Sequence, residues 1–183
     1  MTRWHGRSGV RSDAWFDETL VGRCDGPTID LGCGPGRFVA ALAARDEVVL
    51  GIDHSRHAVA AARRQGASVL CRSIFERLPG EGRWHHVLLI DGNIGIGGEP
   101  DRVVNRAAAL ADPLGVVHVE IDSDIDDVLC ESVRIETDRY TGPWFPWARV
   151  GRSGIEEIGL RHGLAVRAVW SVAERTVAEL VRT

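Results

Sequence analysis

A glycine-rich loop is the feature that most constrains how this chain can fold. Residues 30–37 read D-L-G-C-G-P-G-R. The loop follows a short apolar segment, 28–31, that predicts a β-strand, and it precedes an alanine-rich segment, 38–45, that predicts an α-helix. Glycines at such a turn permit positive φ angles and leave the backbone open to a ligand. The start of the following helix adds free N–H groups, so this unit is typical of a small-molecule site.

Strand and helix patterns alternate along the first two thirds of the chain. Ser12 and Ser55 are the expected N-terminal caps of two helices, and residues 112–115, D-P-L-G, are expected to form a turn. This short, regular alternation predicts an α/β fold with a doubly wound parallel sheet. Further strands are predicted at 48–52, 68–71, 87–90 and 116–121, and further helices at 12–22, 55–65 and 101–111.

The last third of the chain has a different pattern. Residues 122–150 are acidic at first and then aromatic, and they are expected to be irregular. A helix is predicted at 153–162, closed by Gly163. The segments 164–170 and 175–181 are rich in β-forming residues and are predicted to pair in antiparallel fashion at the sheet edge.

The length and composition fit a single domain. The chain has 183 residues, of which 44% are hydrophobic and 26% charged, as expected for a globular protein with a substantial core. No linker, repeat or low-complexity segment divides it. We therefore expect one domain over residues 1–183, in which 1–22 form an N-terminal helical cover and 122–150 an insertion near the active site.

Charge and hydropathy argue against several kinds of partner. The net charge is −4, and the 22 basic residues, all arginines, are scattered rather than gathered into a stripe, which argues against a nucleic-acid partner. Residues 1–10 lack the apolar stretch of a signal peptide, and no apolar run approaches the ~20 residues that span a bilayer. The expected location is the cytoplasm, without a membrane partner.

Metal binding is not predicted. The cysteines are far apart and form no C-x-x-C pair, so neither a zinc knuckle nor a redox pair is indicated. These cysteines are Cys24, Cys33, Cys71 and Cys130. The acidic run 120–127 lacks the glycine turn and the terminal glutamate of an EF-hand loop, and it is expected to be a solvated face.

The residues around the loop favour a cofactor with an amino-acid part over a dinucleotide. Dinucleotide enzymes use G-x-G-x-x-G, whereas this loop reads G-x-G-x-G and has Arg37 where the last glycine would fall. Asp30, just before the loop, can hold an ammonium group but would repel a pyrophosphate. Asp53 ends the next strand, where a carboxylate can accept both hydroxyls of a ribose.

With this loop, the chain resembles the class I methyltransferases, in which D/E-x-G-x-G-x-G binds S-adenosylmethionine. The resemblance is closest to small bacterial members with D-G-N-I-G-I-G-G-D-P after the fourth strand; residues 91–100 here read D-G-N-I-G-I-G-G-E-P. It extends to residues 142–149, G-P-W-F-P-W-A-R. The resemblance implies a Rossmann-like three-layer sandwich, with a seven-stranded, mostly parallel sheet whose last strand is antiparallel. It also implies S-adenosylmethionine as cofactor and S-adenosylhomocysteine as product.

By position, the resemblance implies a set of cofactor-binding residues. The glycine loop would approach the methionine part, Asp53 the ribose, and Ser73 the adenine. Asp91 would organise the cofactor and the loop, and His54 would lie along the adenine or in solvent. The full set is Asp30, Gly32, Cys33, Gly34, Gly36, Asp53, His54, Ser73, Ile74, Phe75, Asp91 and Gly92.

The methyl acceptor is expected beside residues 91–100. The glycines in this segment, at 92, 95, 97 and 98, would leave the backbone exposed and make room for a substrate. Asn93 is assigned to the acceptor, with a simple turn role as the alternative.

The insertion supplies further candidates for the acceptor site. An aromatic wall or lid for a planar acceptor would be formed by Tyr140, Trp144, Phe145 and Trp147, or these side chains would plug the insertion onto the sheet. Arg149 would bind an acceptor carboxylate or form a surface ion pair. No catalytic base is assigned, because His85 and His86 enter the fourth strand from the end opposite the expected site.

These observations predict a methyltransferase that uses S-adenosylmethionine and acts on a small molecule, either a natural product or a metabolite. Three alternatives stay open: a protein that binds S-adenosylmethionine without transferring the methyl group, a nicotinamide-dependent oxidoreductase, and an aminopropyl transferase that uses decarboxylated S-adenosylmethionine. The sequence leaves the acceptor, the methylated atom and the oligomeric state open.

Overall fold

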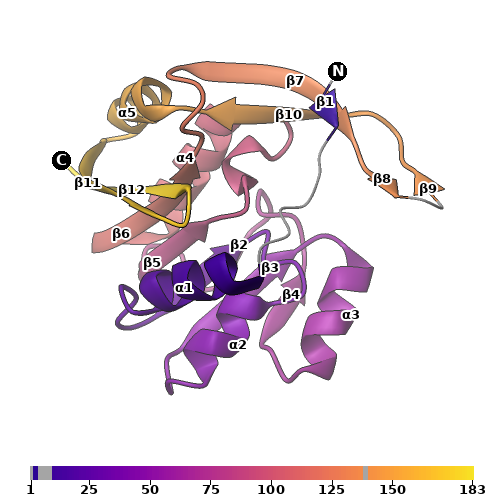
Figure 1. Cartoon of the computed structure of the whole chain (residues 1–183). Helices are drawn as coiled ribbons and strands as arrows, with labels where there is room; N and C mark the ends of the chain where they lie inside the picture. Colours follow the sequence, from indigo (N-terminus) through magenta and orange to yellow (C-terminus); the bar gives the residue numbers. More distant parts are fainter. Residues whose placement is uncertain (1, 4–9, 138–139) are drawn as a thin grey trace.

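The structure, a computed structural model, describes residues 2–3, 10–137 and 140–183. Within these residues, the main sheet has seven strands in the order β11-β12-β6-β5-β2-β3-β4 (Figure 1). These strands are β2 (Thr28–Leu31), β3 (Val49–Asp53), β4 (Val69–Cys71), β5 (Trp84–Leu89), β6 (Ala111–Ile121), β11 (Leu164–Val172) and β12 (Arg175–Arg182). β12 is antiparallel to both of its neighbours, whereas the other pairs are parallel. The predicted fold class is therefore confirmed.

Helices cover both faces of the main sheet. Leu88 of β5 packs with Phe16 and Leu42, from the helices on one face, whereas its neighbour Leu89 packs with Val104 and Ile155, from those on the other. Successive side chains of a strand point to opposite faces, so these contacts define three layers. The first face carries α1 (Val10–Val21), α2 (Arg37–Ala43) and α3 (Arg56–Arg64), and the second α4 (Pro100–Leu110) and α5 (Arg152–Arg161).

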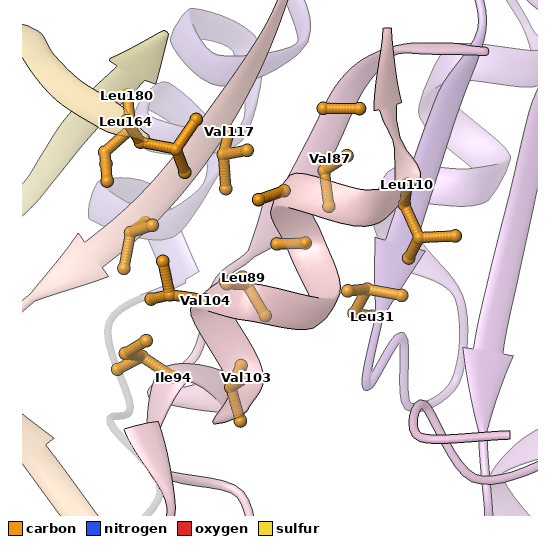
Figure 2. Packing of buried hydrophobic residues seen from close by; sticks show 14 of the residues in the cluster. Leu31, Val87, Leu89, Ile94, Val103, Val104, Leu110, Val117, Leu164 and Leu180 are labelled. Carbon is orange, nitrogen blue, oxygen red and sulfur yellow. The ribbon is translucent and has the colours of Figure 1, made fainter. Parts of the chain in front are cut away.

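The larger core lies between the main sheet and the helices of the second face, α4 and α5. Figure 2 shows Val103 and Val104 of α4 beside Leu89, with Leu164 and Leu180 close to Val117. All six of these side chains are buried. Burying one Leu or Val side chain stabilises a fold by about 1.5–3 kcal/mol, so this layer anchors β5, the strand that leads into the candidate site.

Most local signals are confirmed, with one exception. Ser55 caps α3, since its hydroxyl accepts a hydrogen bond from the N–H of Ala58 at 3.3 Å, and Gly163 ends α5 with a φ of 69°. Ser12 was expected to cap the first helix, but α1 begins at Val10, so that expectation is wrong. The predicted turn 112–115 is present as a bulge within the bounds of β6: Ala111 pairs with Trp84, the next pair is Val116 with His86, and the N–H of Leu114 donates to Oδ1 of Asp112 at 2.9 Å.

A second sheet occupies much of the segment 122–150, which was expected to be irregular. β7 (Val128–Arg134) pairs in antiparallel fashion with β10 (Phe145–Val150), and β1 (Thr2–Arg3) adds to β7 in parallel. The tip of the hairpin carries the short pair β8 (Glu136–Thr137) and β9 (Tyr140–Thr141). Pro146 makes β10 hard to predict from the sequence, because proline is unusual within a strand. β10 tolerates this proline because it is an edge strand, which forms ladder hydrogen bonds on one side only.

The second sheet lies across one end of the main sheet (Figure 1). The N–H of Asp122, just after β6, donates to the carbonyl of Val150 at 2.9 Å, and Ile96, after β5, forms a bridge with Trp147. Parts of the predicted cover 1–22 and insertion 122–150 lie outside the described residues, namely 1, 4–9 and 138–139. Among the helices that the structure describes, none is long and apolar enough to cross a membrane.

The placement of the core gives a test. Leu89→Ala, at a fully buried position in β5, should lower the free energy of unfolding by about 2–5 kcal/mol, because it leaves a cavity under α4. Leu114→Ala, at a side chain that is 92% exposed, should change it by no more than ~0.5 kcal/mol. Denaturant unfolding of both variants checks this, and similar losses would contradict the placement.

Candidate functional site

The glycine loop, residues 32–36, joins β2 to α2 at the carboxyl end of the main sheet. The N–H groups of Gly32 and Cys33 donate to the carbonyl of Ile52 in β3, at 2.8 and 3.0 Å. Gly32, Gly34 and Gly36 all have positive φ. A Cβ added to Gly36 would come within 3.1 Å of Ala62, whereas one added to Gly34 would meet no described atom within 4 Å. The middle of the loop therefore faces open space, as a ligand site requires.

Asp30, the last but one residue of β2, is a buried acid beside this loop. Its side chain is almost completely buried, and Oδ2 has no hydrogen-bond partner among the residues that the structure describes. Burial, together with the charges of Asp91 and Asp53, raises the pKa of Asp30 to about 7, although the charge of Arg37 acts in the opposite direction. A cationic group bound here would compensate for the cost of ionising the buried Asp30 carboxyl group, because an opposite charge favours the ionised acid.

Asp53 ends β3 and is held against the same loop. Its Oδ2 accepts a hydrogen bond from the N–H of Gly34 at 2.9 Å, and its Oδ1 accepts one from the N–H of Ser55 at 2.7 Å. Each carboxylate oxygen can accept more than one hydrogen bond, so both stay able to bind hydroxyl groups. The next residue, His54, is exposed.

The other predicted cofactor residues around β3 and β4 differ in exposure. The Ser73 hydroxyl accepts a hydrogen bond from the N–H of Phe75 at 3.3 Å, while Ile74 is buried. The Phe75 ring lies under the guanidinium of Arg102, 3.9 Å from its centroid. The thiol of Cys33 is directed into the small core under α2 and α3, where burial raises its pKa, so only its backbone faces the loop.

Asp91 is at the centre of a network of charges. It follows β5 with a φ of 58°, which is unusual for a residue other than glycine. The guanidinium of Arg37 donates to both of its carboxylate oxygens, at 2.8 and 3.0 Å, and Arg175 donates to Oδ1 at 2.8 Å. Arg175 also makes two hydrogen bonds to Glu120, at 2.8 and 2.6 Å, and its Cζ lies 3.7 Å from the Phe16 ring centroid. Sequence reasoning missed Arg175 and Glu120, because they are far from Asp91 along the chain.

The glycine segment, residues 92–98, is less open than expected. A Cβ on Gly95 would lie 2.0 Å from the carbonyl oxygen of Ala148, and one on Gly98 would lie 3.0 Å from Pro146. These two glycines therefore let β10 pack directly on the segment, and the expectation that they leave backbone exposed for a substrate is wrong. Asn93 donates from Nδ2 to the carbonyl of Gly32 at 3.0 Å, which ties the segment to the glycine loop.

The insertion residues are spread along the second sheet. The side chain of Trp147 lies near Gly92 and Gly95, so it is the aromatic residue that the structure brings to the glycine segment. Tyr140 and Trp144 are exposed, and β9, which carries Tyr140, extends away from the main sheet (Figure 1). Arg149 donates to Asp122 at 2.6 Å, which matches the ion-pair alternative.

The sequence matches a known family over the region that holds most of this site. Residues 29–115 match the profile of a family described as a methyltransferase domain. The matched region contains the glycine loop, Asp53 and the glycine segment. No curated protein matches the sequence at a significant level.

Solved structures share the fold. An S-adenosylmethionine-dependent methyltransferase from Bacteroides fragilis, in complex with S-adenosylhomocysteine, matches with a TM-score of 0.76 and 17% identity over 91% of this chain and 76% of its own. The CcbJ methyltransferase from Streptomyces caelestis matches with a TM-score of 0.69 and 15% identity over 100% of both chains. The 1,6-didemethyltoxoflavin-N1-methyltransferase from Burkholderia thailandensis matches with a TM-score of 0.67 and 16% identity over 94% of this chain and 77% of its own. At these identities the likeness establishes the fold.

The buried charge network gives a second test. Arg175→Met should lower the free energy of unfolding by about 3–5 kcal/mol, because it leaves the charges of Glu120 and Asp91 without their buried partner. Arg152→Met removes an exposed pair with Glu156 and should cost no more than about 0.5 kcal/mol. Thermal unfolding of both variants, at low and at high salt, measures the loss of stability relative to the wild type. Equal losses of stability in Arg175→Met and Arg152→Met would refute the role of the network.

The raised pKa of Asp30 gives a third test. Because the folded pKa is about 7 and the ordinary value is 3.8, the folded protein keeps a proton that the unfolded chain releases, so stability falls as pH rises from about 4 to 7. Asp30→Asn mimics the protonated acid and should raise the free energy of unfolding of the ligand-free protein by a few kcal/mol at pH 8.

The gain from Asp30→Asn should shrink to less than ~1 kcal/mol near pH 4, where the folded acid is protonated and the acid of the unfolded chain is about half protonated. Asp46→Asn, in an exposed turn, serves as a control and should change stability by less than ~0.5 kcal/mol at both pH values. Denaturant unfolding at the two pH values checks this; a gain that does not depend on pH would contradict the buried, protonated state of Asp30.

Proposed function

We propose that this chain is an S-adenosylmethionine-dependent methyltransferase that acts on a small-molecule acceptor. The observation that carries the proposal is the buried carboxylate of Asp30, which has an oxygen without a partner among the described residues, beside a glycine loop with an open middle. S-adenosylmethionine carries an ammonium group and a ribose, which suit Asp30 and Asp53. The match of residues 29–115 to a methyltransferase domain supports the same cofactor.

The residues present fit this cofactor, and each would have a limited task. Asp30 would accept a hydrogen bond from the ammonium group, and Asp53 would accept hydrogen bonds from the ribose hydroxyls. The N–H groups of Gly34 and Ser55 already fix the Asp53 carboxylate, so binding needs little rearrangement there. Gly34 leaves the backbone accessible. The cofactor supplies an activated methyl group, and the protein supplies alignment and a site from which water is excluded.

No protein base is part of the proposal. Apart from Asp30 and Asp53, which are assigned to the cofactor, the carboxylates of Asp91, Glu120 and Asp122 lie at this edge, and each accepts hydrogen bonds from an arginine. Their charge is therefore already balanced. We infer that the acceptor presents a lone pair that is free at neutral pH, and that the enzyme acts mainly by holding the reactants together.

The acceptor is proposed to lie beside Gly92, at the start of the glycine segment, because β10 covers Gly95 and Gly98. Trp147 lies there, near Gly92, and offers a flat apolar face. One structural neighbour is described as a methyltransferase of 1,6-didemethyltoxoflavin, a small molecule, which is consistent with an acceptor of modest size. Tyr140, Trp144 and Arg149 have exposed or ion-paired positions and are not needed for this proposal.

A thermal-shift titration tests the proposed cofactor. S-adenosylhomocysteine and S-adenosylmethionine at about 100 times their Kd should each raise the melting temperature by about 5–10 °C. NAD should not, and Asp53→Ala should weaken the shift. Incubation with S-adenosylmethionine and a library of small acceptors, followed by mass spectrometry for a gain of one methyl group, then tests transfer.

The alternatives predict different results. A shift with NAD alone would overturn the proposal in favour of a nicotinamide-dependent oxidoreductase. A shift with the adenosyl ligands, without formation of S-adenosylhomocysteine with any acceptor, would favour a protein that binds the cofactor but does not transfer methyl groups.

A further inference from the structure

Three side chains that commonly bind metals lie together, away from the carboxyl edge. Cys24 follows α1, His86 belongs to β5 and His118 belongs to β6, and all three are buried. One potential ligand atom from each lies within 4.8 Å of the other two. The N–H of His86 donates to the carbonyl of Pro27, just before β2, so the cluster lies towards the amino ends of these strands.

The two imidazole rings face each other through one nitrogen each. Nδ1 of His86 is 3.0 Å from Nε2 of His118. Two nitrogen ligands of a tetrahedral zinc ion are about 3.3 Å apart, given Zn–N bonds of about 2.0–2.1 Å. A displacement of a few tenths of an ångström would therefore convert this pair from a hydrogen bond into two ligands of one ion.

The outer nitrogen of each ring faces a carboxylate. Nε2 of His86 is 3.2 Å from Oδ1 of Asp25, and Nδ1 of His118 is 4.0 Å from Oε1 of Glu179. Histidines that bind metals usually donate their other ring N–H to a carboxylate, which fixes the ring and its tautomer. Nε2 of His86 is within hydrogen-bond distance of the Asp25 carboxylate and also of the Asp25 backbone N–H, at 3.2 Å. Nδ1 of His118 has Glu179 near it but makes no hydrogen bond to it. A carboxylate therefore lies near each outer nitrogen, ready to accept a proton that metal binding would place there.

A simple buried hydrogen bond between the rings leaves one atom unexplained. Nδ1 of His118 is buried and has no hydrogen-bond partner among the described residues. If the ring binds an ion through Nε2, Nδ1 carries the proton and is attracted to Glu179. That carboxylate is itself held by Arg23, Arg167 and Trp170, at 2.8–3.1 Å.

We propose that Cys24, His86 and His118 form a zinc site. A thiolate and two imidazoles suit zinc better than hard cations such as magnesium or calcium. On binding, the Cys24 thiol releases its proton to solvent, and each neutral ring carries its proton on the outer nitrogen, towards Asp25 or Glu179. Three protein ligands leave a fourth position for a water molecule. A hollow whose lining includes Arg23, Asp25 and His86 reaches one side of the cluster, at His86.

Cobalt(II) and zinc(II) titration of metal-free, full-length protein tests the site. We expect one cobalt ion per chain, with the visible absorption of a tetrahedral ion and a near-ultraviolet thiolate band, and loss of both when zinc is added. Each ligand is removed in turn by the variants Cys24→Ser, His86→Gln and His118→Gln. Each variant should either lack the thiolate band or bind cobalt at least tenfold more weakly than the wild type. The controls Cys71→Ser and His85→Gln change exposed residues of the same types and should bind like the wild type.

Two outcomes with the cobalt-loaded protein would overturn the proposed zinc site. Absence of a thiolate band in the wild type would overturn it, and so would an unchanged band in folded His86→Gln. If the variants at buried positions fail to fold, Asp25→Asn replaces the test, because that side chain is 97% exposed. Loss of its carboxylate should weaken cobalt and zinc binding by about 10–100-fold, and unchanged affinity would refute the proposal.

Discussion

The buried guanidinium of Arg175 holds the carboxyl edge of the main sheet together. Arg175 is the first residue of β12. Its partners are Glu120, the last but one residue of β6, and Asp91, which follows β5. Because its side chain is only 6% exposed, the charge is tolerated only with both carboxylates in place. Asp91 is in turn bound by Arg37, at the start of α2. The glycine loop and the glycine segment are thereby fixed relative to each other before any ligand binds.

The sequence predicted best what short-range physics decides. The strand before the glycine loop, the helix after it and the cap at Ser55 depend on residues within a few positions of each other, and the structure has all of them. Asp30 and Asp53 could be placed beside the loop because parallel strands bring their carboxyl ends to one edge. The antiparallel pair at the end of the chain was also visible, because both of its strands are rich in β-branched residues.

Long-range contacts explain what the sequence did not predict. β10 was missed because Pro146 argues against a strand, and its only strand partner in the described residues is β7, across the hairpin. The glycines at 95 and 98 read as an open loop, yet they make room for the backbone of β10. His86 and His118 are 32 positions apart, and Cys24 is further still, so no spacing motif marks their cluster.

The position of β12 has a consequence for synthesis on the ribosome. Residues 28–121 can form five parallel strands, but the outer edge of β6 stays unpaired until residues 175–182 have left the exit tunnel. An exposed, apolar strand edge invites pairing with other chains. The nascent chain therefore exposes this edge while the hairpin of β7 and β10 is being translated. During that period, chaperone binding or the rate of translation would decide whether the chain folds or aggregates.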